Sequence, residues 1–221
     1  MNYLIGAGGV GSFIAPALCK LVGVYEVTIM DGDKLEQKNL DRQLFDPTQV
    51  GVNKARALAE LYECSYIEEF FSFGARAYEM WDTLIVAVDN HPARAEALQA
   101  CDHYKCQAII AANEVHSSEA YYYSPDWKGT NLDPRVFYPE ILTVKRGDPR
   151  AAAIGCTGEA QEENRQLVTA NFSAAALAMH LYVVWELEAQ NLETQTREHL
   201  PHRLSQTLSR SESWKAQITT K

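Results

Sequence analysis

Residues 4–33, LIGAGGVGSFIAPALCKLVGVYEVTIMDGD, carry the strongest structural signal of the chain. The apolar run at 3–5 is typical of a buried parallel strand, and the glycine-rich turn after it leads into a predicted helix over 12–22. A second apolar run at 25–30 ends at Asp31. This order of strand, glycine turn, helix and strand is the first unit of a doubly wound α/β sheet.

The glycine turn has the spacing G-x-G-x-x-G, formed by Gly6, Gly8 and Gly11, with Gly9 as an additional glycine. Without side chains the backbone can turn tightly, and its amides at the helix start can approach an anion such as a phosphate. Asp31 follows Gly11 by 20 positions, where an acidic side chain meets the ribose hydroxyls of a nucleotide. The pattern therefore predicts a nucleotide site and leaves open whether the nucleotide is NAD or ATP.

Composition limits the classes of protein to consider. The 221 residues suffice for one large domain, and 47% of them are hydrophobic, enough for a full core. A formal net charge of -9 argues against a nucleic-acid surface. The five cysteines include no C-x-x-C pair and the first strand follows Met1 directly, so we expect a cytoplasmic protein. The apolar stretch 167–185 contains polar residues, so we expect a buried helix and no membrane span.

The chain continues as an alternation of predicted helices and strands. They comprise helices over 51–62 and 91–103, strands over 64–71, 83–88 and 107–112, and an antiparallel strand over 117–124. The alternation predicts a doubly wound, mostly parallel, Rossmann-like sheet with an antiparallel extension. In such sheets ligands lie beyond the carboxyl ends of the strands.

The chain divides into two predicted parts. Residues 1–188 form a nucleotide-binding domain, with a crossover loop rich in proline and glycine at about 124–158 and a long C-terminal helix over 159–188. Residues 189–221 form a polar tail. Its leucines recur at the spacing of one helix face, at Leu200, Leu204 and Leu208. We expect this tail to be either frayed or a docking helix.

Polar and charged side chains that follow Asp31 favour ATP. A hydride-transfer enzyme does not require the set Asn39, Arg42 and Lys54, whereas an enzyme that attacks the α-phosphate of ATP must hold a triphosphate and neutralise the leaving pyrophosphate. Asp89 ends a predicted strand at the same edge and suits magnesium, which prefers carboxylates together with phosphate oxygens. Each residue alone is readily explained as a solvated charge or a helix cap, so only their combination favours ATP.

The motifs GAGGVGS, DGD, NLDRQ, VGVNKA and VDN, with Arg94 downstream, occur in an order that resembles the ThiF/MoeB/HesA family. That family includes the adenylation domains of ubiquitin-activating enzymes. The resemblance covers residues 4–112 well and continues more loosely to residue 185. It implies MgATP-dependent adenylation of the C-terminal glycine carboxylate of a ubiquitin-like or sulfur-carrier protein that ends in Gly-Gly, carried out by a homodimer.

The resemblance also implies roles for individual residues. Asp31 would bind the ATP ribose, Asp89 would bind Mg²⁺, and Asn90 would support the adenylate pocket. The other nucleotide-binding positions would be Gly6, Gly8, Gly9, Gly11, Asp33, Asn39, Arg42, Gln43 and Lys54. Among all these residues, Arg42, Lys54 and Asp89 would act in catalysis.

The sequence departs from the family pattern in places. It has no C-x-x-C pairs, so no structural zinc is expected. The family's N-terminal helix, with an arginine that reaches the ATP of a neighbouring subunit, has no counterpart here, so this cation is either missing or would come from elsewhere. Asp41 lies beside Arg42, where helical geometry is expected to point it away.

Cys156 lies between glycines, after the predicted crossover loop. A helix N-terminus favours the thiolate, and family members that form a thioester carry the cysteine in such a loop, so Cys156 is a candidate acceptor of the acyl group. A small buried cysteine is the alternative. Two other functions also stay open: a nucleotide-binding partner without catalysis and, disfavoured by Arg42, Lys54 and Asp89, an NAD-dependent oxidoreductase.

Overall fold

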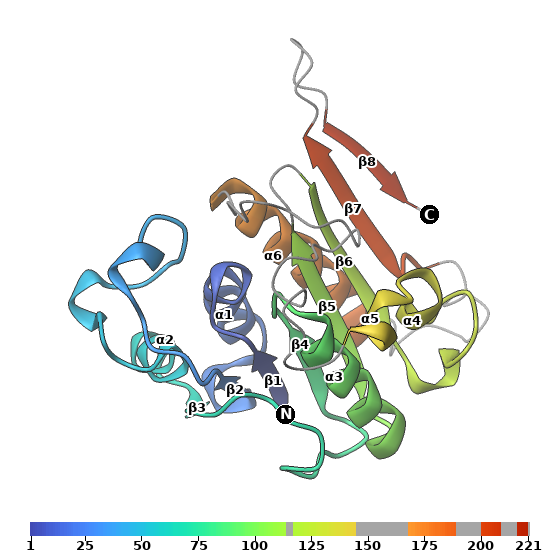
Figure 1. Ribbon diagram of the computed structural model, residues 1–221, viewed down its shortest axis with the longest axis horizontal. Helices are drawn as coiled ribbons and strands as arrows, with labels where there is room; N and C mark the ends of the chain where they lie inside the picture. Colours follow the sequence, from blue (N-terminus) through green and yellow to red (C-terminus); the bar gives the residue numbers. More distant parts are fainter. Residues whose placement is uncertain (114–116, 145–167, 189–199, 209–215, 221) are drawn as a thin grey trace.

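The computed structural model describes residues 1–113, 117–144, 168–188, 200–208 and 216–220, which form one eight-stranded sheet with helices on both faces (Figure 1). The strands are β1 (Asn2–Ile5), β2 (Val27–Met30), β3 (Ser65–Ile67), β4 (Thr83–Val86), β5 (Gln107–Asn113), β6 (Ser117–Tyr123), β7 (Arg203–Leu208) and β8 (Ala216–Thr220). The α-helices are α1 (Gly9–Val22), α2 (Lys54–Tyr62), α3 (His91–Tyr104), α4 (Pro134–Phe137), α5 (Glu140–Thr143) and α6 (Val168–Tyr182).

The strand order is β3-β2-β1-β4-β5-β6-β7-β8. Neighbouring strands from β3 to β5 are parallel, whereas β6 runs antiparallel to β5 and the pairs β6–β7 and β7–β8 are also antiparallel. The predicted doubly wound sheet with an antiparallel extension is therefore confirmed. Because the chain leaves β1 toward β2 on one side and β4 lies on the other, the crevice beyond these strand ends is the expected ligand site.

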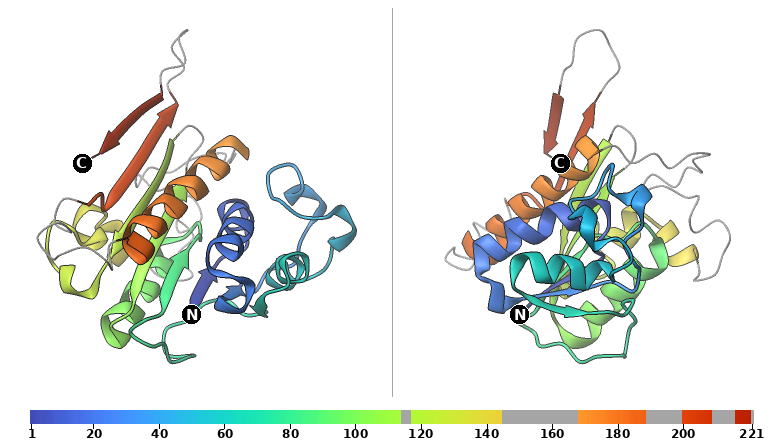
Figure 2. Two further views of the ribbon diagram at one scale, coloured as in Figure 1. Left: turned by 180° about the vertical axis from the view of Figure 1, so that it is seen from behind. Right: turned by 90° about the vertical axis from the view of Figure 1, so that its left-hand side faces the viewer.

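The sheet lies between two layers of helices (Figure 2), and a hydrophobic cluster packs on each of its faces. Successive residues of a strand point to opposite faces, so Leu4 packs with Leu18 of α1 on one face, while Ile5 packs with Leu98 of α3 on the other. All four side chains are at most 1% exposed. Helices α1, α2 and α6 cover the first face, and α3 and α5 cover the second.

The long apolar helix packs within this core. Residues Val168–Leu187 have a mean hydropathy of 1.3 and are long and apolar enough to cross a membrane by length and composition alone. Half of the apolar window is buried, and α6 lies against α1, β5 and β6. The helix continues beyond Tyr182 with the wider turns of a π-helix at Val183–Glu188. The part of the predicted helix at 159–167 lies outside the described residues.

The described parts of the tail contain two strands, β7 and β8, and not the helix or frayed end expected from the sequence. β7 pairs with β6, and Leu204 is 5% exposed in the core. A spacing of four residues satisfies the helical period of 3.6, but it is also a multiple of the strand period of two. The leucine spacing alone therefore could not separate the two structures, and pairing with an available strand decided between them.

Two further boundaries differ from the prediction. The helix expected over 51–62 begins at Lys54, because the side chain of Asn53 accepts a hydrogen bond from the Arg56 amide and caps it. The strand expected over 64–71 is limited to β3. Within the predicted crossover loop, the described residues include the short helices α4 and α5.

Asn171 of α6 joins segments that are distant in the sequence. It is fully buried, and its Nδ2 donates to the carbonyl oxygen of Arg42 at 3.0 Å while its Oδ1 accepts from Asn113 Nδ2 at 2.9 Å. The Arg42 segment is held on its other side by Ser12, whose Oγ accepts from the Leu44 amide at 3.0 Å. Helices α1 and α6 thus hold the loop that carries Arg42 in place.

We expect Asn171→Ala to destabilise the protein, because it removes the partners of a buried amide and a backbone carbonyl. The loss should be about 1–3 kcal/mol in the free energy of unfolding, measured by urea denaturation. His180→Ala on the exposed side of the same helix is the control and should change little. Equal unfolding midpoints for the two variants would contradict the proposed role of Asn171.

Candidate functional site

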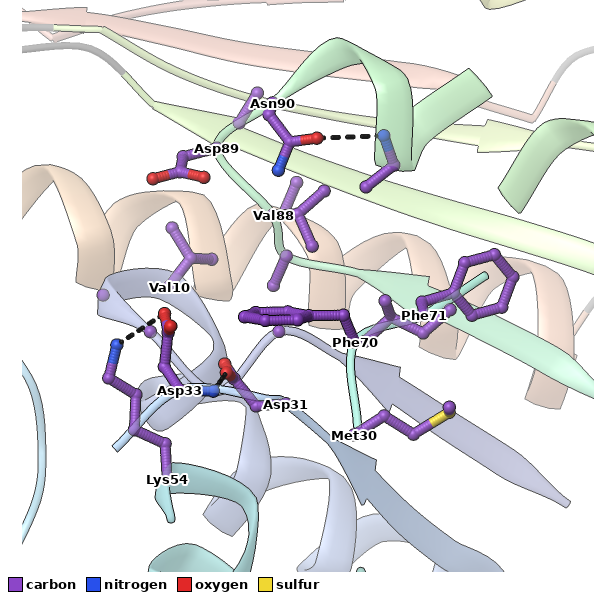
Figure 3. A pocket seen from close by; sticks show the side chains of 18 of the residues that line it. Val10, Met30, Asp31, Asp33, Lys54, Phe70, Phe71, Val88, Asp89 and Asn90 are labelled. Atoms are coloured by element: carbon purple, nitrogen blue, oxygen red, sulfur yellow. Dashed lines mark hydrogen bonds and ion pairs between the residues drawn. The ribbon is translucent and has the colours of Figure 1, made fainter. Parts of the chain in front are cut away.

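A cavity of about 590 Å³ opens beyond the carboxyl ends of β1, β2, β4 and β5 (Figure 3). Most residues predicted for the nucleotide site line it: Gly6, Gly8, Gly9, Asp31, Asp33, Asn39, Arg42, Gln43, Lys54, Asp89 and Asn90. Gly11 lies in the turn but is not among the lining residues. Cys156 lies outside the described residues.

Two glycines of the turn are required by close backbone contacts. Gly6 has φ +94°, and a Cβ there would lie 2.6 Å from the carbonyl oxygen of Ala87 at the end of β4. A Cβ on Gly11 would lie 1.9 Å from the carbonyl oxygen of Gly6. These glycines allow the turn to pack tightly between β1 and α1, and so they determine the path of the backbone that borders the site.

Gly8 has a different role. The nearest atom to a Cβ at this position would be Gln43 Nε2 at 4.0 Å, so packing does not require a glycine. Gly8 is the N-cap of α1, whose first turn contains no acidic residue. A side chain here would enter the cavity in front of the helix N-terminus, where backbone amides and the helix dipole favour an anion.

Asp31 ends β2 and binds the turn directly. One carboxylate oxygen accepts from the Ala7 amide at 2.7 Å and the other from the Asp33 amide at 2.8 Å. Asp31 is 8% exposed, and burial raises the pKa of its carboxyl above the ordinary value, although these two amides and the Lys54 charge act in the opposite direction. The remaining lone pairs of both oxygens can accept from ribose hydroxyls.

The two predicted cations have acidic partners. Lys54, 8% exposed, places its Nζ 3.2 Å from Asp33 at the cavity wall. Arg42 donates from Nη1 to the Lys38 carbonyl at 3.0 Å and to Asp41 at 3.1 Å. The expectation that Asp41 points away from Arg42 is therefore wrong, because the loop after the short helix η2 (Gln37–Asn39) is not helical enough to separate adjacent side chains.

Two amides complete this wall. Asn39 is 5% exposed, and its Oδ1 accepts from the Glu36 amide at 3.0 Å, so the amide nitrogen is the group that a phosphate would meet. The Oε1 atom of Gln43 is buried and has no hydrogen-bond partner among the described residues. As an acceptor, this atom needs a hydrogen-bond donor, which water or a ligand hydroxyl supplies and a phosphate does not.

Asp89 and Asn90 lie on the opposite side of the cavity (Figure 3). Asn90 caps α3, because its Oδ1 accepts from the Ala93 amide at 2.9 Å. Asp89 is exposed, and the described part of the chain contains no group of three or more His, Cys, Asp or Glu side chains that could hold a metal. A single carboxylate fits Mg²⁺ shared with phosphate oxygens and does not fit a metal held by the protein alone.

Phe70 and Asn113 also line the cavity, and sequence patterns did not indicate them. Phe70 lies beyond β3 in a stretch expected to be a strand, where an aromatic residue carries no functional signal. Asn113 is the last residue of the buried strand β5, at the predicted ligand edge. Its position at a strand end was the one signal that could have identified it.

The different roles of Gly8 and Gly11 can be separated by substitution. We expect Gly11→Ala to lower the free energy of unfolding by about 1–3 kcal/mol, because the new methyl group overlaps the Gly6 carbonyl. Gly8→Ala should lower the free energy of unfolding by about 1 kcal/mol at most. It should nevertheless weaken ATP binding strongly, because its methyl group enters the anion site. Urea denaturation and calorimetric titration with ATP measure the two effects. Unchanged ATP affinity in Gly8→Ala would contradict the assignment of the anion site.

Comparisons with known proteins identify relatives of the chain. Among curated proteins, the chain is 32% identical over 124 residues to ubiquitin-like modifier-activating enzyme 5 of Drosophila persimilis and 30% identical over 120 residues to that of Drosophila melanogaster. The alignments cover 47% and 45% of this chain and 32% and 30% of those proteins. The chain thus spans about a third of the length of the curated relatives it matches.

Solved structures share the fold. MccB of E. coli with AMPCPP and MccA has a TM-score of 0.64 at 20% identity, covering 99% of this chain and 63% of that chain. MccB of E. coli with ATP has a TM-score of 0.64 at 18% identity, covering 99% and 62%. The model of the ThiF family matches residues 2–179. Because this match extends over most of the chain, the protein belongs to the ThiF family.

Proposed function

We propose that this protein is an ATP-dependent adenylating enzyme that activates the C-terminal carboxylate of a protein substrate. One observation carries the proposal. A single cavity combines an anion site at the N-terminus of α1, a carboxylate for ribose at Asp31, two cations at Arg42 and Lys54, and a separate carboxylate at Asp89. The solved MccB structures with AMPCPP or ATP support a nucleotide of this kind.

The reaction needs positioned charge more than proton transfer. A substrate carboxylate oxygen forms a bond to the α-phosphorus of ATP, while the bond to pyrophosphate breaks and its electron pair leaves with the pyrophosphate. No proton has to be moved by the protein. Lys54 and Arg42 therefore act by holding phosphate oxygens and stabilising the charge that grows on the leaving group.

The remaining residues position the nucleotide. The α1 amides near Gly8 receive a phosphate, Asp31 orients the ribose, and the Asn39 amide contacts the polyphosphate. Asp89 would hold Mg²⁺, which neutralises phosphate charge when bound. Asn90 keeps the Asp89 turn in place as the cap of α3.

The substrate we favour is a ubiquitin-like or sulfur-carrier protein that ends in Gly-Gly. The curated relatives are ubiquitin-like modifier-activating enzymes, and one solved MccB structure contains MccA. The adenylate would then pass its acyl group to a thiol or a sulfur. We further propose that the protein acts as a homodimer in the cytoplasm.

Pyrophosphate exchange with labelled ATP tests this function. The wild-type chain should catalyse exchange when a carrier from a panel of ubiquitin-fold proteins ending in Gly-Gly is added. Binding of ATP without exchange for any carrier would indicate a noncatalytic partner protein. Absence of both ATP binding and exchange, together with NAD binding, would indicate an oxidoreductase.

We expect Lys54→Ala and Asp89→Asn each to lower the exchange rate about 100-fold or more, because each removes a charge that acts on the phosphates. The fold should survive both changes, since Asp89 is exposed and the Asp33 partner of Lys54 can be solvated. Lys38→Ala is the matched control, because Lys38 lies on the same segment as Arg42 but does not line the cavity. Variants that exchange as fast as Lys38→Ala would remove Lys54 or Asp89 from the catalytic role.

A further inference from the structure

Gly32, between the two acidic residues of the β2 turn, lies directly against the ring of Phe70. A Cβ at Gly32 would come within 2.6 Å of Phe70 Cδ2, 2.7 Å of Cε2 and 2.8 Å of Cγ. Gly32 is not among the glycines with positive φ, so its backbone conformation is open to other residues. The glycine is needed because it makes room for the ring of Phe70.

The Phe70 ring is exposed in the cavity. Phe70 is 60% exposed and lines the cavity, whereas the adjacent Phe71 is 3% exposed and belongs to the core beneath. Figure 3 shows the Phe70 ring extending into the cavity between Asp31 and Val88, with Phe71 turned away from it. An aromatic ring held over a glycine and open to a cavity offers apolar area to a flat ligand.

The position of the ring within the site identifies that ligand. The anion site at Gly8 and the carboxylate of Asp31 define where phosphate and ribose would lie. Gly32 follows Asp31 directly, and Phe70 covers Gly32. The base attached to a ribose at Asp31 would therefore meet Phe70.

We propose that the ring of Phe70 is the platform on which the nucleotide base stacks, and that Gly32 leaves the space in which this ring lies. The larger ring system of a purine is preferred over that of a pyrimidine. The inference rests on the proposed function, because it takes the ligand to be a nucleoside triphosphate. Stacking of a base on an aromatic side chain changes affinity by roughly 10- to 100-fold. Phe70 thus determines the base, while Asp31 and the α1 turn bind groups that all nucleotides share.

Calorimetric titration of the full chain with ATP, CTP and tripolyphosphate tests the platform. Phe70→Leu should weaken the binding of ATP about 10-fold or more and the binding of CTP less. The affinity for tripolyphosphate should not change, because it has no base. Phe70→Trp should keep ATP affinity. Tyr66→Leu is the control, since Tyr66 is an exposed aromatic residue of β3 that does not line the cavity.

Gly32→Ala provides a second test that leaves Phe70 in place. The methyl group displaces the ring, so Gly32→Ala should weaken ATP binding as Phe70→Leu does. The double variant Gly32→Ala/Phe70→Leu should bind ATP little more weakly than either single variant. Tighter ATP binding by Phe70→Leu would show that the ring occupies the position of the base and would overturn the platform. Equal losses for ATP and tripolyphosphate would also overturn it, by assigning Phe70 a structural role.

The two levels of proposal fail differently. If the wild-type chain binds ATP and supports exchange but Phe70→Leu and Gly32→Ala match the Tyr66→Leu control, the platform is wrong and the adenylation function stands. If the wild-type chain binds none of the three ligands, both proposals are overturned.

Discussion

The hydrogen bonds of Asp31 hold the ligand side of this protein together. Its two carboxylate oxygens bind the amides of Ala7 and Asp33, which ties the glycine turn after β1 to the turn after β2. Its backbone binds in two further directions, because its amide donates to Ile67 and its carbonyl accepts from Asn53. The residue that is suited to ribose is therefore the residue on which four segments converge, and the shape of the site depends on it.

The cations of the site are neutralised within the protein. Lys54 is nearly buried, and an unpaired charge in that position would be costly, so its contact with the more exposed Asp33 stabilises the site. Arg42 is paired with the exposed Asp41. Asp33 and Asp41 are solvent-exposed, so a triphosphate can replace them as partners of Lys54 and Arg42 at small cost. Each aspartate regains its hydration when it is replaced.

The elements that the sequence predicted well depend on local patterns. The glycine spacing, the apolar strands and Asp31 all lie within one βαβ unit, where steric rules and periodicity act over short distances. The tail was ambiguous because a leucine every fourth residue fits both a helix and a strand. The contact between Asp41 and Arg42 depended on a loop whose backbone geometry no periodicity describes.

The roles of Phe70 and Asn171 were not predictable for another reason. Asn171 meets Arg42 across 129 positions of sequence, and Phe70 becomes meaningful only through its contact with Gly32. Such pairs exist because the sheet brings distant strand ends together, so no single stretch of sequence carries the signal. The topology predicts where the cavity lies, but it does not predict which distant side chains contact each other around it.

Asn171 connects two residues that line the cavity, Arg42 and Asn113, through hydrogen bonds. Its side chain bonds at once to the backbone of Arg42 and to Asn113, at the end of β5. A ligand that shifts either residue must work against the hydrogen bond of the other. Thermodynamic reciprocity then requires that any coupling be symmetric. If a molecule bound beside Asn113 changes the affinity for a second molecule beside Arg42, the second molecule changes the affinity for the first by the same factor.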